Sequence, residues 1–448
     1  MWRRSWDERE HGQSSTGRGA GLSVEHGSVR RVKIGIDIRA TQTEHRGRGI
    51  GRYVFDVIDG MVRVGGRHDY VLFGMAEAPI PPPFQELPRN FRIAPVGGPL
   101  LHSEFKRWYV GIPHFGSTRL AQRANYESLY RKQVRSFTEI VNAAALDVIH
   151  LPAPIDVHVC SDGRFNCRRV ATFFDAIPLA MPEQFLDRWP EILQIHFRRQ
   201  MDTYRKANVV VAISNASRLD AIRFLDLPSE KVETVYCGAR ARNHTAIDEA
   251  TARLVLARFG VANPFFVFCS VCDFHKNWER MLEAYRVTRN DGLATQLVMV
   301  SARDDGHFPR VDKLRRQLNF TEGEVIVTGR ITDDELAVLY SRALALISPA
   351  FYEGFGLPAL EAMAFGTPVI AADRTSLPEV VGDAGLFFDP SDTAALAVAM
   401  KELATQPELR ASLSSKCASR VSLFSVERQA MNLLAAYGGE RVSTVGRT

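Results

Sequence analysis

The sequence predicts an α/β protein with two domains, each built around a parallel, doubly wound sheet. At 448 residues, the chain is too long for one ordinary hydrophobic core and suits two domains of about 200 residues each. Hydrophobic residues make up 46% and charged residues 24%, which is the profile of a soluble globular protein. In the second half, short apolar strands alternate with helices, a pattern typical of parallel doubly wound sheets.

The first predicted domain covers residues 31–240 and follows an N-terminal tail at 1–30. The tail is polar, rich in glycine, serine and arginine, and without periodicity. We expect it to be disordered, or to reflect a start codon placed too early. The proline-rich stretch 79–88 excludes helix and central strand. Strands of this domain are expected at 32–38, 70–73, 147–151, 170–174, 209–213 and 233–236.

The second predicted domain covers residues 241–424, and a last helix follows it. Thr332 and Glu335 have the spacing of a capping box at the start of a helix. Ser425 is placed to cap the last helix, expected at 425–438. Strands of this domain are expected at 265–271, 297–301, 325–329, 344–347, 369–372 and 386–388.

Two acids bracket a glycine-rich turn at residues 354–357. Pro358 is favoured where a helix begins, so a helix is expected to start near it. A helix start offers free backbone N–H groups and a positive dipole end, which suit a phosphate. Glu353 precedes this helix and Glu361 falls in its expected first turn, so both carboxylates can accept hydrogen bonds from paired sugar hydroxyls. The turn indicates a nucleotide-sugar pocket; plain connection chemistry between strand and helix is the alternative.

Three polar side chains follow predicted strands of the first domain. The functional groups of an open parallel sheet gather at the carboxyl ends of its strands. His150, Asp175 and Ser214 all fall at such ends, and this shared location makes them candidate site residues. Ser214 and Ser217 are also placed to cap the helix that follows them.

Residues 351–370 read FYEGFGLPALEAMAFGTPVI, with seven residues between Glu353 and Glu361. This stretch resembles the signature of the retaining glycosyltransferases of the GT-B type, in particular their family 4. The resemblance implies the GT-B fold, with two Rossmann-like doubly wound domains facing across a cleft and the last helix packing back on the first. It also implies that Glu353 lies by the transferred sugar and that Glu361 binds the ribose of the donor. The turn amides that are expected to hold phosphate or sugar belong to Gly354, Phe355, Gly356 and Leu357.

Residues 273–278, DFHKNW, resemble the second donor motif of the same family. Lys276 is then the residue that neutralises the diphosphate. An ammonium group stabilises the charge that develops on a leaving diphosphate more in the transition state than in the ground state. His275 and Arg330 are the candidates for a second cation. The alternative for Lys276 is an exposed lysine at a helix start.

A glycine turn at residues 48–53 matches the position of the family's glycine loop, which lies between acceptor and donor sites. Gly49 and Gly51 are therefore candidate ligand contacts, and Arg48 and Arg52 are candidate partners of a phosphate or of the acceptor. A plain tight turn remains the alternative for each arginine.

The first half departs from the family pattern at two positions. Relatives often carry His-Asp where this chain has Phe174 and Asp175, and Asn-Gly where it has Cys237 and Gly238. The aspartate and the glycine are kept, but the imidazole is not. Asp175 is expected to orient the acceptor, and Phe174 can form an apolar wall of the acceptor pocket.

The resemblance implies transfer of a hexose from a nucleotide diphosphate sugar to an acceptor hydroxyl with retention of configuration. GDP-mannose is the favoured donor because mannose is frequent in the family, and a glycan or lipid-linked saccharide is the expected acceptor. No cofactor and no metal are expected, since Asp333 and Asp334 open a helix and Asp304 and Asp305 form a turn. The alternatives are a nucleotide-sugar epimerase of the same fold and a non-catalytic homologue that binds sugar nucleotides.

Charge and composition bound the remaining partners. A net charge of +5 favours an anionic substrate or membrane surface and does not require nucleic acid. No apolar run reaches the ~20 residues that span a bilayer, and the six scattered cysteines suit a reducing cytoplasm. The basic, aromatic stretch 99–144 is either a peripheral membrane face, placing the protein at the inner face of the membrane, or a solvated helix face. The oligomeric state is left open.

Overall fold

A computed structural model describes residues 31–47, 49–97, 119–155, 161–239, 247–262, 264–301, 308–440 and 442. The predicted tail at 1–30, Arg48, and the pair Asp304 and Asp305 lie outside these residues. Of the basic, aromatic stretch 99–144, residues 99–118 also lie outside them, whereas residues 119–144 lie within them.

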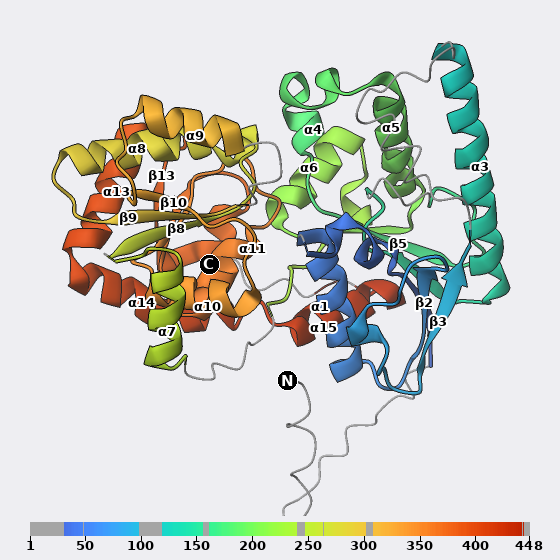
Figure 1. The fold of residues 1–448 in the computed structure, drawn as a ribbon. Coiled ribbons are helices and arrows are strands. Elements are labelled where there is room, and N and C mark those ends of the chain that lie inside the picture. Colours follow the sequence, from blue (N-terminus) through green and yellow to red (C-terminus); the bar gives the residue numbers. More distant parts are fainter. Residues whose placement is uncertain are drawn as a thin grey trace, which may run out of the picture. The chain divides into compact units, whose positions relative to one another are not determined.

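The first sheet contains seven parallel strands within the described ranges (Figure 1). Their order, β3-β2-β1-β4-β5-β6-β7, moves outward from β1 in both directions, which is the doubly wound arrangement. The strands are β1 (Lys33–Asp37), β2 (Asp69–Met75), β3 (Phe91–Val96), β4 (Val148–Leu151), β5 (Arg168–Phe173), β6 (Val209–Ala212) and β7 (Val232–Thr234). The helices between and beside them are α1 (Gly49–Val64), α3 (Arg119–Ala143), α4 (Ile177–Ala180), α5 (Glu191–Lys206) and α6 (Asn215–Leu225).

Strand β3 was not expected from the sequence. It contains Pro95, which lacks an N–H donor and argues against a central strand. The structure places β3 at the edge of the sheet, where it pairs only with β2 and where the missing donor is tolerated.

The second sheet contains six parallel strands in the order β10-β9-β8-β11-β12-β13. Figure 1 shows helices on both of its faces, with α8 and α9 on one side and α10 and α14 on the other. The strands are β8 (Phe265–Cys269), β9 (Gln296–Val300), β10 (Val325–Val327), β11 (Leu346–Ser348), β12 (Val369–Ala372) and β13 (Gly385–Phe388). The helices are α7 (Glu249–Arg258), α8 (Trp278–Asn290), α9 (Phe308–Gln317), α10 (Asp333–Arg342), α11 (Leu357–Ala364), α12 (Leu377–Val381), α13 (Thr393–Thr405) and α14 (Pro407–Val421).

Two predicted helix caps are confirmed. The Thr332 hydroxyl accepts from the Glu335 N–H, and the Glu335 carboxylate accepts from the Thr332 N–H at 2.8 Å, which completes the capping box of α10. The Ser425 hydroxyl accepts from the Arg428 N–H at 3.2 Å and caps the last helix, α15 (Val426–Gly438).

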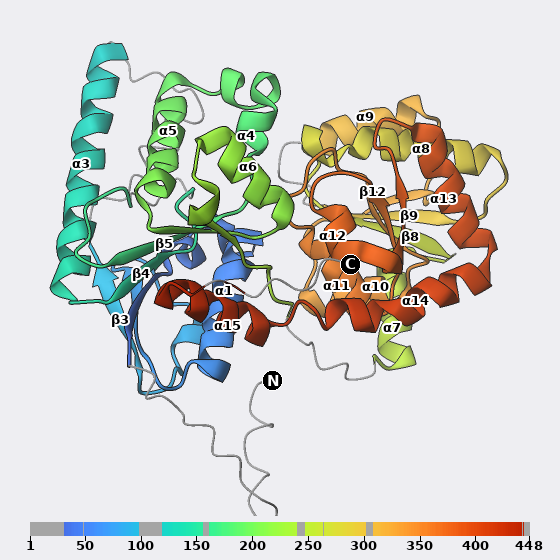
Figure 2. The ribbon, with the colours of Figure 1, turned by 180° about the vertical axis from the view of Figure 1, so that it is seen from behind.

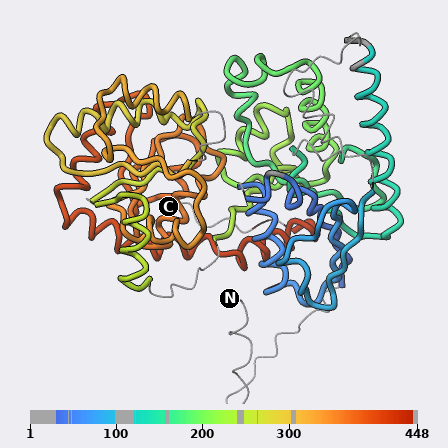
Figure 3. The backbone as a smooth tube through the Cα atoms, viewed as in Figure 1, coloured from blue at the N-terminus to red at the C-terminus, as the bar shows by residue number. Residues whose placement is uncertain are grey.

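Helix α15 follows the second sheet in sequence but packs on α1 beside the first. Figures 2 and 3 show this red C-terminal helix next to the blue α1. The contact is close because α1 carries Gly60 there, where a Cβ atom would lie 2.4 Å from the Val426 carbonyl oxygen. The Gln429 side chain accepts from the Gly238 N–H at 3.0 Å and ties α15 to the segment after β7.

Candidate active site

The turn after β11 leads into α11 through a glycine in the left-handed region. Gly356 has φ = +96° and caps α11, and a Cβ atom there would lie 2.9 Å from Leu377. The helix begins at Leu357, with Pro358 in its first turn as expected. Glu361 is therefore in the second turn of α11, not the first as predicted, because the helix starts just before Pro358. The two glutamates of the turn consequently meet different neighbours.

Glu353 forms an ion pair with Lys276. The Lys276 ammonium lies 2.7 Å from Glu353 Oε1, and both side chains are about 15% exposed, at 15% and 14%. Lys276 ends the short 3₁₀ turn Phe274–Lys276 that follows β8, and Glu353 follows β11, the neighbouring strand. Two strand ends of the second sheet thus bring a cation and a carboxylate together, as this sheet class favours.

Asn277 holds these two strand ends in register. Its backbone is left-handed at φ = 54°, and its buried side chain donates to the Pro349 carbonyl at 3.0 Å and to the Pro390 carbonyl at 2.8 Å. The asparagine amide thereby fixes the loop that carries Lys276 to the loop that carries Glu353. In the Lys-Asn pair of the motif, Lys276 supplies the positive charge and Asn277 fixes the position of the loop that carries it.

The first half meets this turn at Phe174 and Asp175. A Cβ atom on Gly354 would lie 2.5 Å from the Phe174 carbonyl oxygen and 3.1 Å from the Asp175 Cβ, so the contact requires glycine. Asp175 is half-buried and accepts from the Ile177 N–H at 3.1 Å. Burial raises the pKa of Asp175, with Glu353 adding to the rise and Lys276 opposing it. The three predicted catalytic side chains therefore share one electrostatic environment.

Helix α6 supplies further contacts to the same turn. The Tyr352 hydroxyl donates to the Asp220 carboxylate and accepts from the Ala176 N–H at 3.3 Å. The Ser217 hydroxyl lies 3.0 Å from the Gly354 carbonyl oxygen and 2.6 Å from that of Phe174, so it bridges the two halves. These contacts fix the position of the turn relative to the first sheet.

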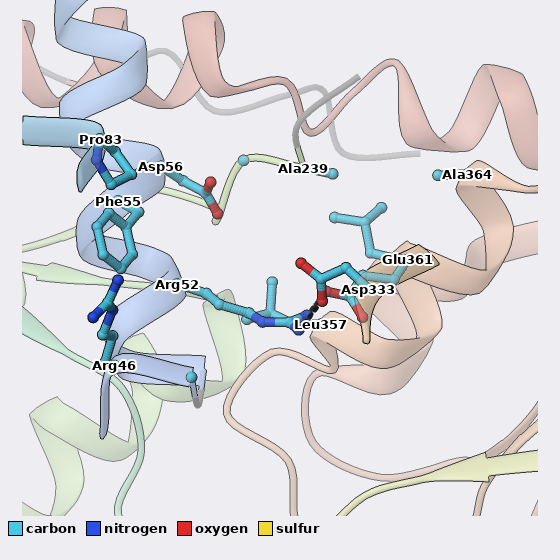
Figure 4. A pocket seen from close by; sticks show the side chains of 13 residues that line it. Arg46, Arg52, Phe55, Asp56, Pro83, Ala239, Asp333, Leu357, Glu361 and Ala364 are labelled. Atoms are coloured by element: carbon cyan, nitrogen blue, oxygen red, sulfur yellow. Dashed lines mark hydrogen bonds and ion pairs between the residues drawn. The ribbon is translucent and has the colours of Figure 1, made fainter. Parts of the chain in front are cut away.

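Glu361 faces α1 of the first half. Arg52 Nη1 lies 2.5 Å from Glu361 Oε1, and Arg52 Nη2 lies 2.9 Å from Asp333 Oδ1. Figure 4 shows Arg52 reaching from α1 to both acids. The buried Tyr340 hydroxyl donates to Glu361 Oε2 at 3.3 Å, so each carboxylate oxygen has a donor. Burial works against the charge of Arg52, but Glu361 and Asp333 outweigh it and raise the pKa of Arg52.

This ion pair lines a cavity of about 430 Å³ between α1 and α11 (Figure 4). Arg46, Phe55 and Asp56 line its side from the first half, and Leu357 and Glu361 line it from the second. The cavity walls therefore carry charged groups of both signs, which can form hydrogen bonds, and the apolar ring of Phe55.

Two family models match the chain in succession. "Glycosyltransferase Family 4" matches residues 47–243, and "Glycosyl transferases group 1" matches residues 258–420. The second range contains the Lys276 motif and both glutamates of the turn. The chain belongs to glycosyltransferase family 4. The expected GT-B fold of this transferase is likewise confirmed by its two parallel sheets.

Individual relatives agree with this assignment. The transferase is 28% identical to O-antigen chain mannosyltransferase B of Escherichia coli over 275 residues, which covers 60% of this chain and 70% of that protein. It is 26% identical to the serotype-specific mannosyltransferase WbdA of Escherichia coli over 262 residues, 58% of this chain but 32% of that longer protein. Sucrose-phosphate synthase from Thermosynechococcus elongatus shares the fold, with a TM-score of 0.66, 20% identity and coverage of 91% and 99%.

His150 is a correction to the predicted site of the transferase. It is fully buried within β4, with Nε2 2.8 Å from the Thr172 hydroxyl and Nδ1 2.7 Å from the Tyr437 hydroxyl. Burial lowers the pKa of His150 to about 3, so the ring is neutral. It joins α15 to the first sheet and has no surface for a ligand. Ser214 is likewise buried and caps α6 by accepting from the Ser217 N–H at 2.9 Å.

His275 does not supply the second cation. It is 7% exposed and lies beside Phe185, with ring centroids 5.6 Å apart. Burial, aided by the Lys276 charge, lowers the pKa of His275 to about 3. Its ring is therefore neutral near pH 7. The predicted role of His275 in donor binding is then limited to hydrogen bonding or packing. Arg330 is exposed on the segment between β10 and α10, and its role as a cation stays a prediction.

The predicted glycine loop is the start of α1. A Cβ atom on Gly51 would lie 2.4 Å from the His45 carbonyl oxygen, so the preceding 3₁₀ turn (Glu44–Gly47) packs directly on it. Gly49 is exposed, and a Cβ there would lie 3.7 Å from Leu357 of the donor turn. Gly49 thus lies beside the donor turn, whereas Gly51 packs on the 3₁₀ turn, and ligand contact by either glycine stays a prediction. Phe174 is buried edge-to-face against Tyr53 and belongs to the core instead of forming a pocket wall.

Sequence reasoning missed the residues that support the turn from β12 and α12. The Glu353 N–H donates to the Thr375 hydroxyl at 3.0 Å, and the Ser376 hydroxyl donates to the Glu353 carbonyl at 2.9 Å. Glu379 accepts from the Asn215 and Ala216 N–H groups at 2.9 Å and so caps α6 across the two halves. No local sequence pattern signals this cap, because Glu379 lies 164 and 163 residues from the two amides.

Within the described part of the chain, no cluster of three or more histidine, cysteine or acidic side chains is arranged to hold a metal ion. No helix among the same residues is long and apolar enough to cross a membrane.

Proposed function

We propose that this transferase moves a hexose from a nucleotide diphosphate sugar to a hydroxyl of a glycan or lipid-linked saccharide, with retention of the anomeric configuration. The observation that carries the proposal is the placement of Lys276, Glu353 and Glu361 around one glycine turn at a helix start. We take GDP-mannose as the first donor to test, because the two bacterial relatives are named mannosyltransferases.

The geometry suits a donor that lies along the turn. Lys276 and the N-terminal amides of α11 offer positive charge and N–H donors to a diphosphate. Glu361, further along α11, offers carboxylate oxygens to the paired hydroxyls of a ribose. The sugar would then sit by Glu353, near Asp175 of the first half.

Bond breaking separates the anomeric carbon from a diphosphate oxygen, which takes the bonding electron pair. Lys276 stabilises that growing negative charge, so its effect is larger in the transition state than in the bound donor. The acceptor hydroxyl attacks the same face of the sugar and passes its proton to the departing phosphate oxygen. Asp175 orients the acceptor hydroxyl through its half-buried carboxylate.

The proposed cellular location of the reaction depends on the expected acceptor. We propose that the reaction takes place in the cytoplasm, at the inner face of the membrane when the acceptor carries a lipid. The buried cysteines Cys237 and Cys417 form no disulfide, which supports a reducing compartment.

A donor panel with product analysis tests the function. The purified chain is heated with each nucleotide sugar, since a ligand that binds the folded state raises the melting temperature. Donors that bind are then incubated with and without oligosaccharide acceptors, and the products are resolved by mass spectrometry and NMR. We expect an acceptor extended by one hexose with the donor's anomeric configuration. A new nucleotide sugar formed without acceptor would indicate an epimerase, and binding with no product would indicate a non-catalytic protein.

A further inference from the structure

Arg52 forms an ion pair with Glu361, whose carboxylate is also the proposed binding group for the donor ribose. One of its guanidinium nitrogens lies 2.5 Å from Glu361 Oε1, while the second oxygen of Glu361 accepts from Tyr340 at 3.3 Å. A ribose offers two neighbouring hydroxyl donors to a carboxylate. Arg52 and Tyr340 together supply the same two hydrogen bonds, so a ribose and Arg52 compete for Glu361.

The contact differs from an ordinary surface ion pair in its burial. Glu361 is 16% exposed and Arg52 is 32% exposed, so solvent screens this pair less than the exposed pairs of the chain. Arg52 also belongs to α1 of the first half, whereas its partners lie on α10 and α11 of the second. Whatever displaces Arg52 from Glu361 also removes a bond between the two halves.

Asp333 can keep the Arg52 guanidinium paired after it leaves Glu361. Its carboxylate lies 2.9 Å from Arg52 Nη2 and is 67% exposed, so it stays accessible when Glu361 is taken by another donor. Arg52 then retains a counter-charge without Glu361. The cavity of about 430 Å³ beside the pair gives the side chain room to move (Figure 4).

We propose that Arg52 is an internal competitor of the donor ribose: its ion pair with Glu361 lowers donor affinity and is exchanged for ribose hydroxyls when the donor binds. Arg52 is thus a specificity-determining residue that penalises ribose and leaves a nucleotide without ribose hydroxyls unaffected. This inference rests on the proposed role of Glu361. A purely structural ion pair would make no distinction between the two kinds of nucleotide.

Calorimetric titration of the full chain with GDP or UDP, and with the matching 2′,3′-dideoxy nucleotide, tests the proposal. We expect Arg52→Ala and Arg52→Gln to bind the ribonucleotide about five- to tenfold more tightly, the range of a partly buried ion pair, and to bind the dideoxy form as the wild type does. Arg63→Ala is the matched control, because Arg63 lies on the same helix, pairs with Asp59 and Glu427, and does not line this cavity. Weaker ribonucleotide binding by both Arg52 variants, or an equal change for both nucleotides, would overturn the proposal.

Glu361→Ala separates this inference from the function on which it rests. If Glu361 binds the ribose, this variant loses the preference for ribonucleotide over dideoxynucleotide. The preference for ribonucleotide could be lost in Glu361→Ala but unchanged in both Arg52 variants. In that case Glu361 binds the ribose as proposed, and the proposal that Arg52 competes with the ribose is wrong. If Glu361→Ala keeps the preference, the ribose assignment itself fails, and the inference about Arg52 fails with it.

Discussion

The Lys276 ammonium lies 2.7 Å from Glu353 Oε1, and the pair joins the ends of two neighbouring parallel strands. In the proposed reaction the two partners have separate parts: Lys276 neutralises the diphosphate, and Glu353 lies by the transferred sugar. Their mutual contact also means that a diphosphate has to share or replace Glu353 as the counter-charge of Lys276. Substitution of Glu353 is therefore expected to change diphosphate binding and transfer in opposite directions, whereas substitution of Lys276 should reduce transfer more than binding.

Glu353→Gln should bind free nucleoside diphosphate a few-fold more tightly than the wild type, yet transfer hexose more slowly. The amide is neutral and no longer competes for the Lys276 charge, but it also removes the carboxylate beside the sugar. Calorimetry with the diphosphate and steady-state transfer rates measure the two effects separately. Weaker diphosphate binding in this variant would mean that Glu353 does not compete for Lys276.

Gly354→Ala should lower activity by more than tenfold and destabilise the fold by about 1–3 kcal/mol, the usual cost of overpacking. Its Cβ would lie 2.5 Å from a backbone oxygen of Phe174, which has little freedom to move. Gly66→Ala is the control, because a Cβ there meets no heavy atom within 4 Å. Urea unfolding and transfer rates check both variants; equal behaviour of the two alanines would show that the close contact with Phe174 is unimportant.

Asp175 should set the acidic limb of the pH–rate profile. Burial raises the pKa of Asp175, so its carboxylate is protonated at a higher pH than that of an ordinary aspartate. If the charged form orients the acceptor, kcat/KM falls as the pH drops through this raised pKa. Asp175→Asn should be slower and lack that limb. The same acidic limb in the variant would assign it to another group.

His150 should make the fold sensitive to acid. Its pKa is about 3 in the folded protein, against about 6.5 for an unperturbed histidine, so below pH 6.5 the unfolded chain binds the extra proton. The free energy of unfolding then falls by about 1.4 kcal/mol per pH unit between pH 6.5 and 3 from this group alone. Urea unfolding at pH 7, 6 and 5 measures the slope. His150→Gln should be less stable at pH 7 but have a shallower slope, and an unchanged slope would contradict this prediction.

Local patterns in the sequence were enough to place most of the fold. The apolar runs predicted twelve of the strands to within a few residues, and the capping box and Ser425 marked two helix starts because capping depends on adjacent residues. Strand β3 was not predicted because Pro95 suits a strand at the edge of a sheet but not a central one. The position of a strand in its sheet is a tertiary property that local sequence does not show. The start of α11 depended on the left-handed backbone of Gly356, which moved Glu361 into the second turn.

The site was less predictable where it depends on contact between the halves. Asp220, Ser217 and Glu379 act on partners more than 130 residues away in sequence, so no local pattern marks them. His150 was misassigned because it lies within β4 and points into the packed interface with α15, whereas Asp175 lies past the end of β5. Residues at the carboxyl end of a strand divide between core and site, and only the packing decides which.

The most direct test of the proposed site compares Lys276→Ala with the wild type in transfer rate and in donor affinity, using the donor identified by the panel. We expect kcat to fall by about 10²–10³-fold while the dissociation constant of the donor changes by less than about tenfold, since the charge of Lys276 matters most when the diphosphate leaves. Lys401→Ala, which removes the exposed ion pair with Asp291, serves as the control and should keep wild-type kinetics. Wild-type kcat in Lys276→Ala with every active donor would contradict the assignment of this turn as the site of transfer.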